Sequence, residues 1–456
     1  MAVDFLLLDG TIVSMDRHHP FYKSGGVAID QGRIVAVGPT EEIKTRYSAD
    51  QIINCKNKLL VPGLINCHVH LEHSIGRGFF SDLDLDEWER RLGKLRSFLS
   101  PTNAPTVAAL SFLEMIKTGT SCFVDCGTYP GVQEQIAETA VKSGLRGILS
   151  RRTVDLHDSL FSAALPNYLR EDTETAIDAA KRFVERYNGI GDGRIQAWFN
   201  LMVLTDCSDK LCISISELAK EYGVGLTTHA AWHKSEVEAC LQRFGVRPIE
   251  RLDKLGVLGP HVLAAHMGLL ENHEVQLVDK YDVRVCHCPS ATLHSGYGCA
   301  FYGHFPEMRE LGVALSLGTD GASSSNFLDM VREMYLLSTL HKEAKQSSTV
   351  FPAADSLSIA TLGGARALGS MESLGSISPG KKADIAVFDL TRITFIPASE
   401  RTIVNNLVYS ATGESCSSLI VDGKALMLNN EVLTLSETEI LEKSQAYGES
   451  LAADLT

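Results

Sequence analysis

The stretch Val61-Pro62-Gly63-Leu64-Ile65-Asn66-Cys67-His68-Val69-His70 determines how the rest of the chain is read. It is an apolar run that ends in two histidines separated by one residue. Residues two apart on a β-strand point to the same side, so both imidazoles would face one centre at the end of a buried strand. Neutral imidazole is a good ligand for zinc, iron and nickel. The stretch therefore predicts the beginning of a metal site that later strands must complete.

Composition and charge narrow the class of protein. The chain has 456 residues, 45% hydrophobic and 21% charged, as is typical of a globular protein with one large and one small domain. No apolar run is long enough to predict a membrane span, and the first residues lack the basic leader of a signal peptide. The net charge of −14 argues against binding to nucleic acid. Eleven scattered Cys favour reduced thiols in a cytoplasmic protein.

From Leu59 onward, short apolar runs alternate with amphipathic segments of helix length. The candidate strands are residues 59–66, 121–125, 145–150, 195–201, 225–229, 262–266, 283–286 and 314–318. The candidate helices are residues 104–117, 132–143, 174–187, 209–222, 237–244 and 273–280. Eight β-then-α units predict a closed parallel (β/α)8 TIM barrel. The alternative is an open doubly wound sheet, but no Gly-rich phosphate motif follows the first strand.

Both ends of the chain are rich in β-strand signals. Residues 5–38 alternate short β-like runs with turns, and Asp9-Gly10 and Gln31-Gly32 are typical of hairpins. Residues 403–408 and 418–421 are predicted to continue the β structure after residue 374, and residues 436–451 are predicted to form a terminal helix. We therefore expect an α/β protein. Residues 59–370 would form the barrel, and residues 1–58 and 371–456 would form a small β-sandwich beside it.

Polar residues stand at the ends of other candidate strands. His229 closes the fifth strand, His266 closes the sixth, and Asp320 follows the eighth. Taken singly, each has an ordinary structural explanation as a hydrogen-bonded histidine or a turn residue. Catalytic groups in such barrels project from the carboxyl ends of the strands. Together with His68 and His70, these residues form a set of four His and one Asp around one barrel mouth, which favours a metal site.

Several motifs resemble those of the amidohydrolase superfamily. They are residues 62–70, Arg77-Gly78-Phe79, residues 84–88, His287-Cys288-Pro289-Ser290, Gly318-Thr319-Asp320-Gly321 and residues 375–389. The most similar branch is the ATZ/TRZ group, which contains S-adenosylhomocysteine and guanine deaminases, triazine hydrolases and atrazine chlorohydrolase. The resemblance covers nearly the whole chain and implies a (β/α)8 barrel with a β-sandwich built from both termini.

The resemblance also implies the ligands of the metal. One divalent ion would be held by His68, His70, His229 and Asp320, and we expect zinc, with iron as the alternative. His266 would contact the attacking water or the substrate instead of serving as a primary ligand. No lysine at the fourth strand suggests a carboxylated bridge between two metals, so a single ion is favoured.

One position departs from this group. Its deaminases and triazine hydrolases carry a Glu three residues after the fifth-strand His, where this chain has Trp232. An indole N–H cannot carry protons as a carboxylate does. His233 is a candidate for that role because imidazole titrates near neutral pH, and Glu72 is a second candidate. The alternative for His233 is a cap of the following loop.

Substrate contacts are less well defined by the sequence. Trp88 and Trp232 are candidates to flank a planar ring, with core packing as the alternative for both. The weaker candidates for substrate binding are Arg77, His294 and Asn326. S-adenosylhomocysteine deaminases usually hold the ribose with a Glu after the tryptophan motif and a His after the fourth strand. Residues 96–98 and 201–203 offer neither, which disfavours a nucleoside.

These observations predict a hydrolase that activates water with a metal ion. Asp320 would accept the water proton, and His266 would orient the nucleophile or stabilise the developing oxyanion. We expect an aminohydrolase (deaminase) acting on a small heterocycle, with no nucleic-acid or membrane partner. The alternatives are a chlorohydrolase-like or cyclic-amide hydrolase, and a catalytically impaired barrel that only binds. We also expect a homo-oligomer, a dimer or larger.

Overall fold

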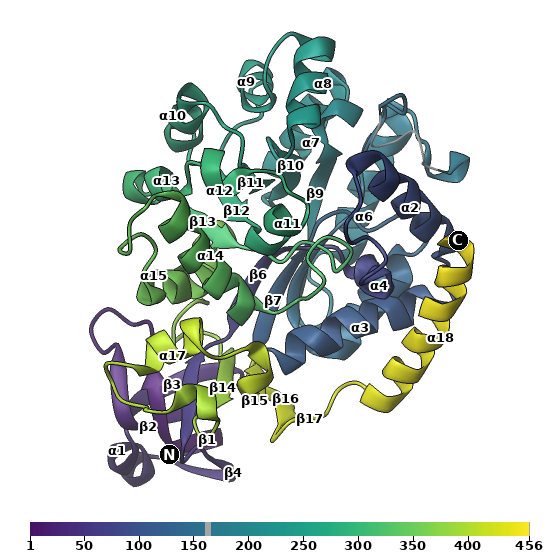
Figure 1. Cartoon of the computed structure of the whole chain (residues 1–456). Helices are drawn as coiled ribbons and strands as arrows, with labels where there is room; N and C mark the ends of the chain where they lie inside the picture. The colour runs from purple at the N-terminus through teal and green to yellow at the C-terminus, as the bar shows by residue number, and fades with distance from the viewer. Residues whose placement is uncertain (160–165, 456) are drawn as a thin grey trace.

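The first of two sheets is a barrel of parallel strands, seen near the centre of Figure 1. The computed structural model describes residues 1–159 and 166–455. The strands follow chain order: β6 (Leu64–Val69), β7 (Thr120–Asp125), β8 (Arg146–Ser150), β9 (Ile195–Val203), β10 (Leu226–Ala230), β11 (Val262–His266), β12 (Arg284–His287) and β13 (Leu315–Leu317). The (β/α)8 architecture and the second to eighth predicted strands are confirmed.

The helices of the barrel lie around these strands (Figure 1). They are α2 (Leu85–Phe98), α3 (Ala104–Lys117), α4 (Gln133–Ser143), α6 (Thr173–Tyr187), α7 (Asp209–Tyr222), α8 (Lys234–Phe244), α9 (Pro248–Lys254), α10 (Asn272–Lys280), α11 (Pro289–His294), α12 (Cys299–Tyr302), α13 (Phe305–Leu311), α14 (Met330–Ala344), α15 (Ala353–Ser358) and α16 (Gly364–Ala367). The six helices predicted within the barrel are confirmed to within three residues at each end.

The barrel closes between its first and last strands through a buried polar contact. The Asn66 side chain donates to Thr319 Oγ1 at 2.8 Å and accepts the Thr319 N–H at 3.1 Å. The backbone N–H of Asp320 donates to the His68 carbonyl at 2.9 Å. Hydrogen bonds of this kind satisfy the backbone where two short strands meet. They also hold Asp320 directly beside the first histidine pair.

The first predicted strand is two strands in different sheets. Residues 58–62 form β5 (Lys58–Pro62), which pairs antiparallel with β14 (Ile385–Asp389) in the terminal sheet, and β6 begins at Leu64. Gly63 lies between them. A Cβ at Gly63 would lie 2.2 Å from Ser121 Oγ, so no larger residue fits without a shift. We propose that the barrel domain begins after Gly63 and not at residue 59.

The two ends of the chain share the second sheet, as expected. Its strands run in the order β17-β16-β15-β14-β5-β1-β2-β3, with β4 paired to β1. The remaining strands are β1 (Ala2–Val13), β2 (Phe21–Asp30), β3 (Arg33–Pro39), β4 (Ser48–Asn54), β15 (Cys416–Val421), β16 (Lys424–Leu428) and β17 (Glu431–Val432), and α1 (Thr40–Arg46) packs beside β2 and β3. Gln31-Gly32 makes the predicted hairpin between β2 and β3, with positive φ at both residues.

Two local predictions at the ends of the chain are wrong. Asp9-Gly10 is not a hairpin: it lies inside β1, where a φ of 66° at Asp9 and a register slip produce a bulge. Residues 403–408 form helix α17 (Ile403–Tyr409) and not a strand. The β-branched Ile403 and Val404 favoured a strand, but the buried positions Ile403, Leu407 and Val408 have helical spacing.

The predicted terminal helix is confirmed as α18 (Glu437–Leu455), which packs against α3 and α2 (yellow in Figure 1). Within the described ranges, no helix is both long and apolar enough to cross a membrane.

Candidate active site

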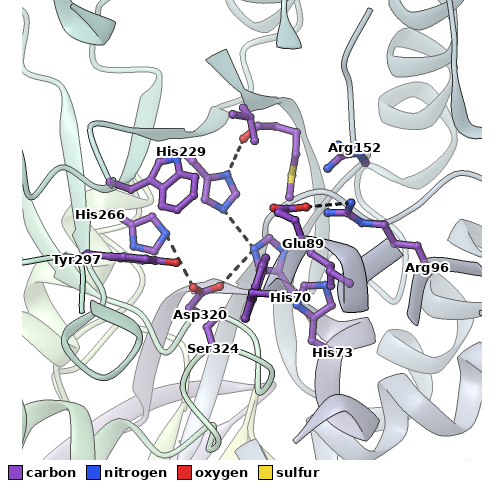
Figure 2. A pocket seen from close by; sticks show the side chains of 15 residues that line it. His70, His73, Glu89, Arg96, Arg152, His229, His266, Tyr297, Asp320 and Ser324 are labelled. Atoms are coloured by element: carbon purple, nitrogen blue, oxygen red, sulfur yellow. Dashed lines mark hydrogen bonds and ion pairs between the residues drawn. The ribbon is translucent and has the colours of Figure 1, made fainter. Parts of the chain in front are cut away.

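Five polar side chains from four barrel strands meet at the carboxyl end of the barrel, and four of them, all but His68, are labelled in Figure 2. His70 Nε2 lies 3.4 Å from Asp320 Oδ1 and 3.3 Å from His229 Nε2. His68 Nε2 lies 3.5 Å from the same Asp320 oxygen, and His266 Nε2 lies 4.0 Å from Asp320 Oδ2. All five residues are buried. The structure thus brings together the residues predicted from the strand ends.

The spacing of these atoms fits a single divalent ion. Four donors that each lie 2.0–2.2 Å from a tetrahedral ion are separated from one another by about 3.3–3.6 Å. Three of the separations fall in that range: 3.3 Å for His70–His229, 3.4 Å for His70–Asp320 and 3.5 Å for His68–Asp320. His68 Nε2 is buried and has no hydrogen-bond partner among the described residues. Three imidazole nitrogens and one carboxylate oxygen are a donor set that divalent transition metals accept.

The tautomer of His229 is fixed by its backbone partner. Its Nδ1 lies 2.7 Å from the Met202 carbonyl, which can only accept, so Nδ1 carries the proton. The lone pair is therefore on Nε2, which faces the candidate ligand set of His68, His70, His229 and Asp320. When a histidine binds a metal through one ring nitrogen, a hydrogen bond from the other nitrogen orients the ring.

Burial keeps these rings neutral. It lowers the pKa of His68 to about 3, and burial with the neighbouring His68 lowers the pKa of His229 to about 3. Burial also holds the pKa of His266 well below its usual value, despite the opposing effect of Asp320. Neutral imidazoles present lone pairs, which is the form that binds a metal.

His266 and Asp320 both have left-handed backbone conformations, with φ of 71° and 60°. Positive φ is uncommon in residues other than glycine and costs roughly 1–3 kcal/mol unless the surroundings enforce it. The Asp320 side chain accepts the N–H of Gly321 at 2.7 Å, which helps to hold the turn. The bends turn both side chains toward the ligand set.

A pocket opens beside the ligand set and is shown in Figure 2. One wall of the pocket is formed by residues of α2, a segment for which no helix was predicted from the sequence. The lining residues are His70, His73, Trp88, Glu89, Leu92, Arg96, Arg152, Met202, Val203, His229, Trp232, His266, Tyr297, Asp320 and Ser324. The pocket thus places candidate metal ligands, aromatic rings and two buried arginines around one space.

Comparison with known proteins agrees with this geometry. The profile of the amidohydrolase family matches residues 59–426, and a profile described as an imidazolonepropionase-like composite domain of bacteria matches residues 25–47. The chain is a member of the amidohydrolase family. The resemblance noted from the motifs is therefore confirmed.

Relatives of this amidohydrolase carry deaminase names. The chain is 33% identical to a 5'-deoxyadenosine deaminase of Methanosarcina mazei, covering 99% of both proteins. It is 33% identical to a 5-methylthioadenosine/S-adenosylhomocysteine deaminase of Moorella thermoacetica, covering 95% of this chain and 96% of that protein. A crystal structure of an adenosine deaminase from Xanthomonas campestris with bound zinc superposes with a TM-score of 0.91 at 25% identity, covering 99% of both chains.

The two predicted tryptophans of this amidohydrolase both line the pocket. Trp232 packs edge-on against Tyr297 with ring centroids 5.2 Å apart, and its centroid is 6.4 Å from that of His266. Trp88 packs edge-on against Phe80 at 5.8 Å. Both rings are therefore in position to contact a bound heterocycle.

Four other predicted contacts lie away from the pocket lining. His233 caps the N-terminus of α8, where its Nδ1 accepts the N–H of Ser235 at 3.2 Å. Arg77 is ion-paired with Glu114. His294 is exposed, and its Nε2 lies 2.8 Å from the side-chain nitrogen of Asn326, whose oxygen accepts the Gly78 N–H. These contacts fix local structure, and the capping alternative for His233 matches its position.

Glu72 is also separated from the reacting space. It is 1% exposed, and its carboxylate accepts the N–H of Tyr129 at 2.9 Å. Burial and the nearby Asp125 raise the pKa of Glu72 to about 8. Glu72 does not belong to the pocket lining, so its carboxyl supports the loop that carries Tyr129.

The sequence reasoning missed the residues that α2 contributes. Glu89 and Arg96 follow Trp88 on one helix, and the spacing of seven residues places them on the same face. The signal available in the sequence was the position of these two charged residues on the apolar face of an amphipathic helix. His73, also missed, lies three residues after His70; its Nδ1 lies 3.0 Å from Ser323 Oγ, and its ring stacks on the His70 ring with centroids 4.8 Å apart.

Glu89 is the carboxyl group that α2 contributes to the pocket wall. Burial raises its pKa to about 7, although Arg96 and Arg152 oppose that rise. Its Oε2 lies 3.4 Å from Arg96 Nη1. Glu89 and Asp320 are the carboxyl groups among the described residues that line the pocket.

Proposed function

We propose that this amidohydrolase is a zinc-dependent aminohydrolase that removes an amino group, as ammonia, from a small heterocycle. One observation carries the proposal: at the mouth of the barrel, His68 Nε2 and His70 Nε2 lie 3.5 and 3.4 Å from one oxygen of Asp320, and His70 Nε2 lies 3.3 Å from His229 Nε2. The ligands would be His68, His70, His229 and Asp320. The deaminase names of the relatives support the reaction type.

A divalent ion bound there supplies a nucleophile at neutral pH, because it lowers the pKa of water from 15.7 to about 7. Asp320 takes up the proton released by the water. His266 lies on the opposite side of Asp320 from His70 (Figure 2) and is placed to stabilise the negative charge that develops on the substrate. Trp88 and Trp232 hold the plane of the ring.

We assign proton delivery to the departing amino group to Glu89. The water oxygen bonds to the ring carbon and one water proton passes to Asp320. The carbon–nitrogen bond then breaks, and the amino nitrogen receives one proton and leaves as ammonia. A group that donates a proton at neutral pH works best with a pKa near 7. The pKa of Glu89 is raised to about 7, and its carboxyl lines the same pocket. Glu89 thereby takes the role of the carboxyl that is missing at Trp232, and His233 is not required for it.

Loss of chloride is the second candidate reaction. Chloride leaves without a proton, so a chlorohydrolase would have no use for a carboxyl near neutrality. The position and raised pKa of Glu89 favour amine loss over chloride loss. Cyclic-amide hydrolysis and a binding-only barrel remain the further alternatives, and the assay below separates them by product.

The experiment is a product assay with purified, zinc-loaded enzyme. Aminopyrimidines, aminotriazines, pterins, aminopurines and 5'-deoxyadenosine are each incubated with the protein. Ammonia and chloride are quantified separately, and mass spectrometry detects ring opening. Ammonia release that Asp320→Asn abolishes supports the proposal. Chloride release or ring opening without ammonia contradicts it, and so does an absence of turnover with every compound.

We further propose a cytoplasmic location and a homo-oligomer. All eleven cysteines are free and buried thiols, which suits a reducing compartment. Light scattering coupled to size-exclusion chromatography measures the assembly; a monomer would contradict that part of the proposal.

A further inference from the structure

A cavity lies at the amino end of the barrel, at the opposite ends of the strands that carry the candidate metal ligands. Gly225 comes just before β10, His261 just before β11, and Arg284 is the first residue of β12, and all three line the cavity. A parallel strand rises about 3.3 Å per residue, so the step from His261 to His266 spans roughly 16 Å. The cavity is therefore separate from the candidate active site.

The size and charge of this cavity suit a small anion. Its volume is about 790 Å³, within the range of about 300–1,000 Å³ that is usual for ligand pockets. The basic side chains Lys220, His261 and Arg284 line it, and no carboxylate does so among the described residues. This is a local excess of basic groups in a chain whose net charge is −14.

The basic side chains of the cavity have neutral partners in the described part of the chain: Lys220 Nζ donates to the Gly256 carbonyl at 3.2 Å, His261 Nε2 lies 3.0 Å from Ser216 Oγ, and Arg284 Nη1 donates to the Ala367 carbonyl at 3.0 Å. Asp282 also attracts Arg284, but it is exposed and ion-paired with Arg366 at 3.6 Å. Burial and the charges of Lys220 and Arg284 lower the pKa of His261 to about 4. An anion in the cavity would remove this repulsion.

Arg284 supplies the most directional donors. Its Nη1 is used by the Ala367 carbonyl, whereas no described residue accepts a hydrogen bond from its Nε or Nη2. These two groups share one edge of the guanidinium, the edge that pairs side by side with two oxygens of an anion. Gly369 lies beside the guanidinium, and a Cβ there would come within 3.2 Å of Nη2. The absence of a side chain at Gly369 thus leaves Nη2 accessible.

An aromatic ring also lines the cavity. Trp198 of β9 lies over Gly225, where an added Cβ would come within 2.3–2.5 Å of the indole ring. Glycine at this position therefore makes room for the ring. An indole next to basic groups suits a ligand that combines a flat apolar part with an anionic group.

We propose that the amino mouth of the barrel is a second binding site, for a small molecule that carries a phosphate group. Arg284 and Lys220 hold the phosphate, and Trp198 contacts the rest of the ligand. A phosphate monoester carries a charge of about −1.5 to −2 at neutral pH, which matches these two permanent cations. The site goes beyond the proposed function, which uses the other end of the barrel.

The test is calorimetry on the zinc-loaded enzyme with phenyl phosphate, benzoate and inorganic phosphate. Benzoate keeps the ring and changes the anion, and inorganic phosphate lacks the ring. Arg284→Gln removes the charge but keeps a donor for the Ala367 carbonyl, and Lys220→Met removes the second cation at an exposed position. Lys210→Met is the matched control, because Lys210 is exposed at the other end of α7 and paired with Glu174.

Wild type should bind one phenyl phosphate per chain, more tightly than benzoate or inorganic phosphate. Arg284→Gln should weaken that binding roughly 10- to 150-fold, as expected for lost hydrogen bonds to a charged group. Lys220→Met should weaken it about 2- to 5-fold, as expected for an exposed ion pair, and Lys210→Met should not change it. Absence of saturable binding, or benzoate binding as tightly as phenyl phosphate, overturns the proposal.

Two further comparisons identify where the ligand binds. Phenyl phosphate should raise the melting temperature of the wild type and of Asp320→Asn, but not that of Arg284→Gln. Binding that Asp320→Asn loses and Arg284→Gln retains places the ligand beside the metal and overturns the proposal. If Arg284→Gln does not fold, an unchanged affinity in Lys220→Met overturns it instead. Binding is measured without turnover, so a protein that binds phenyl phosphate through Arg284 but releases no ammonia supports this site and contradicts the proposed function.

Discussion

His70 and His229 face each other through their Nε2 atoms at 3.3 Å, from strands on different sides of the barrel. The Nδ1 proton of His229 is committed to the Met202 carbonyl, so its Nε2 has a lone pair and no hydrogen. Two such nitrogens repel each other unless a proton or a cation lies between them. The pair is therefore arranged to share a positively charged ligand.

Removal of the metal should abolish turnover. A chelator followed by dialysis is expected to eliminate ammonia release, because the carboxylate and imidazoles alone leave water at its ordinary pKa. One equivalent of zinc per chain should restore the rate. Elemental analysis together with the ammonia assay checks both statements. Undiminished activity in demonstrably metal-free protein would exclude the mechanism.

His266→Asn should reduce kcat by about 10²- to 10⁴-fold while leaving the metal content unchanged, because it removes a stabilising group and not an expected ligand. His273→Asn, on α10 and paired with Glu250 at the surface, is the control and should retain full activity. Steady-state kinetics and elemental analysis measure the two effects. Loss of zinc from His266→Asn would show that this residue is a ligand.

Glu89→Gln should lower kcat and remove one limb of the pH profile. Glu89 must be protonated to donate, and its pKa is raised to about 7 by burial. The rate limited by Glu89 should therefore fall as the pH rises above about 7. Glu87→Gln, two residues earlier on the outer side of α2 and bonded to Arg90 and Arg91, should keep the wild-type profile. An unchanged alkaline limb in Glu89→Gln would assign the proton to another group.

Gly63→Ala should destabilise the fold by about 1–3 kcal/mol, as overpacking does. The added methyl would meet Ser121 at 2.2–2.4 Å. Gly448→Ala is the control, because nothing lies within 4 Å of its added Cβ in α18, and alanine favours a helix by about 1 kcal/mol. Urea unfolding measures both. Equal stability of Gly63→Ala and wild type would show that the joint tolerates a side chain.

Much of the architecture could be predicted because its signals are local. Each barrel strand is a short apolar run, and His229, His266 and Asp320 stand where those runs end. Parallel strands place their carboxyl ends together, so sequence position alone predicts that the ligands meet. The prediction that these polar residues meet required no knowledge of side-chain packing, whereas the choice of metal ligands among them came from the family resemblance.

The pocket wall was less predictable because it depends on tertiary packing. Glu89 and Arg96 lie on α2, which precedes the second barrel strand and folds over the mouth. Nothing in the sequence around Arg152 shows that Arg151 takes the structural partners and leaves its neighbour unpaired. The spacing of His233 from His229 favours a role in proton transfer, but the start of α8 uses its side chain as a cap.

The sharing of the terminal sheet between both ends of the chain has a consequence for biosynthesis. Strand β5, which leads directly into the histidine strand, pairs with β14, and β14 is translated more than 300 residues later. A nascent chain that has completed every barrel strand still lacks this partner. We expect ribosome-bound or prematurely terminated chains to hold zinc poorly, so the enzyme matures only when its last hundred residues emerge.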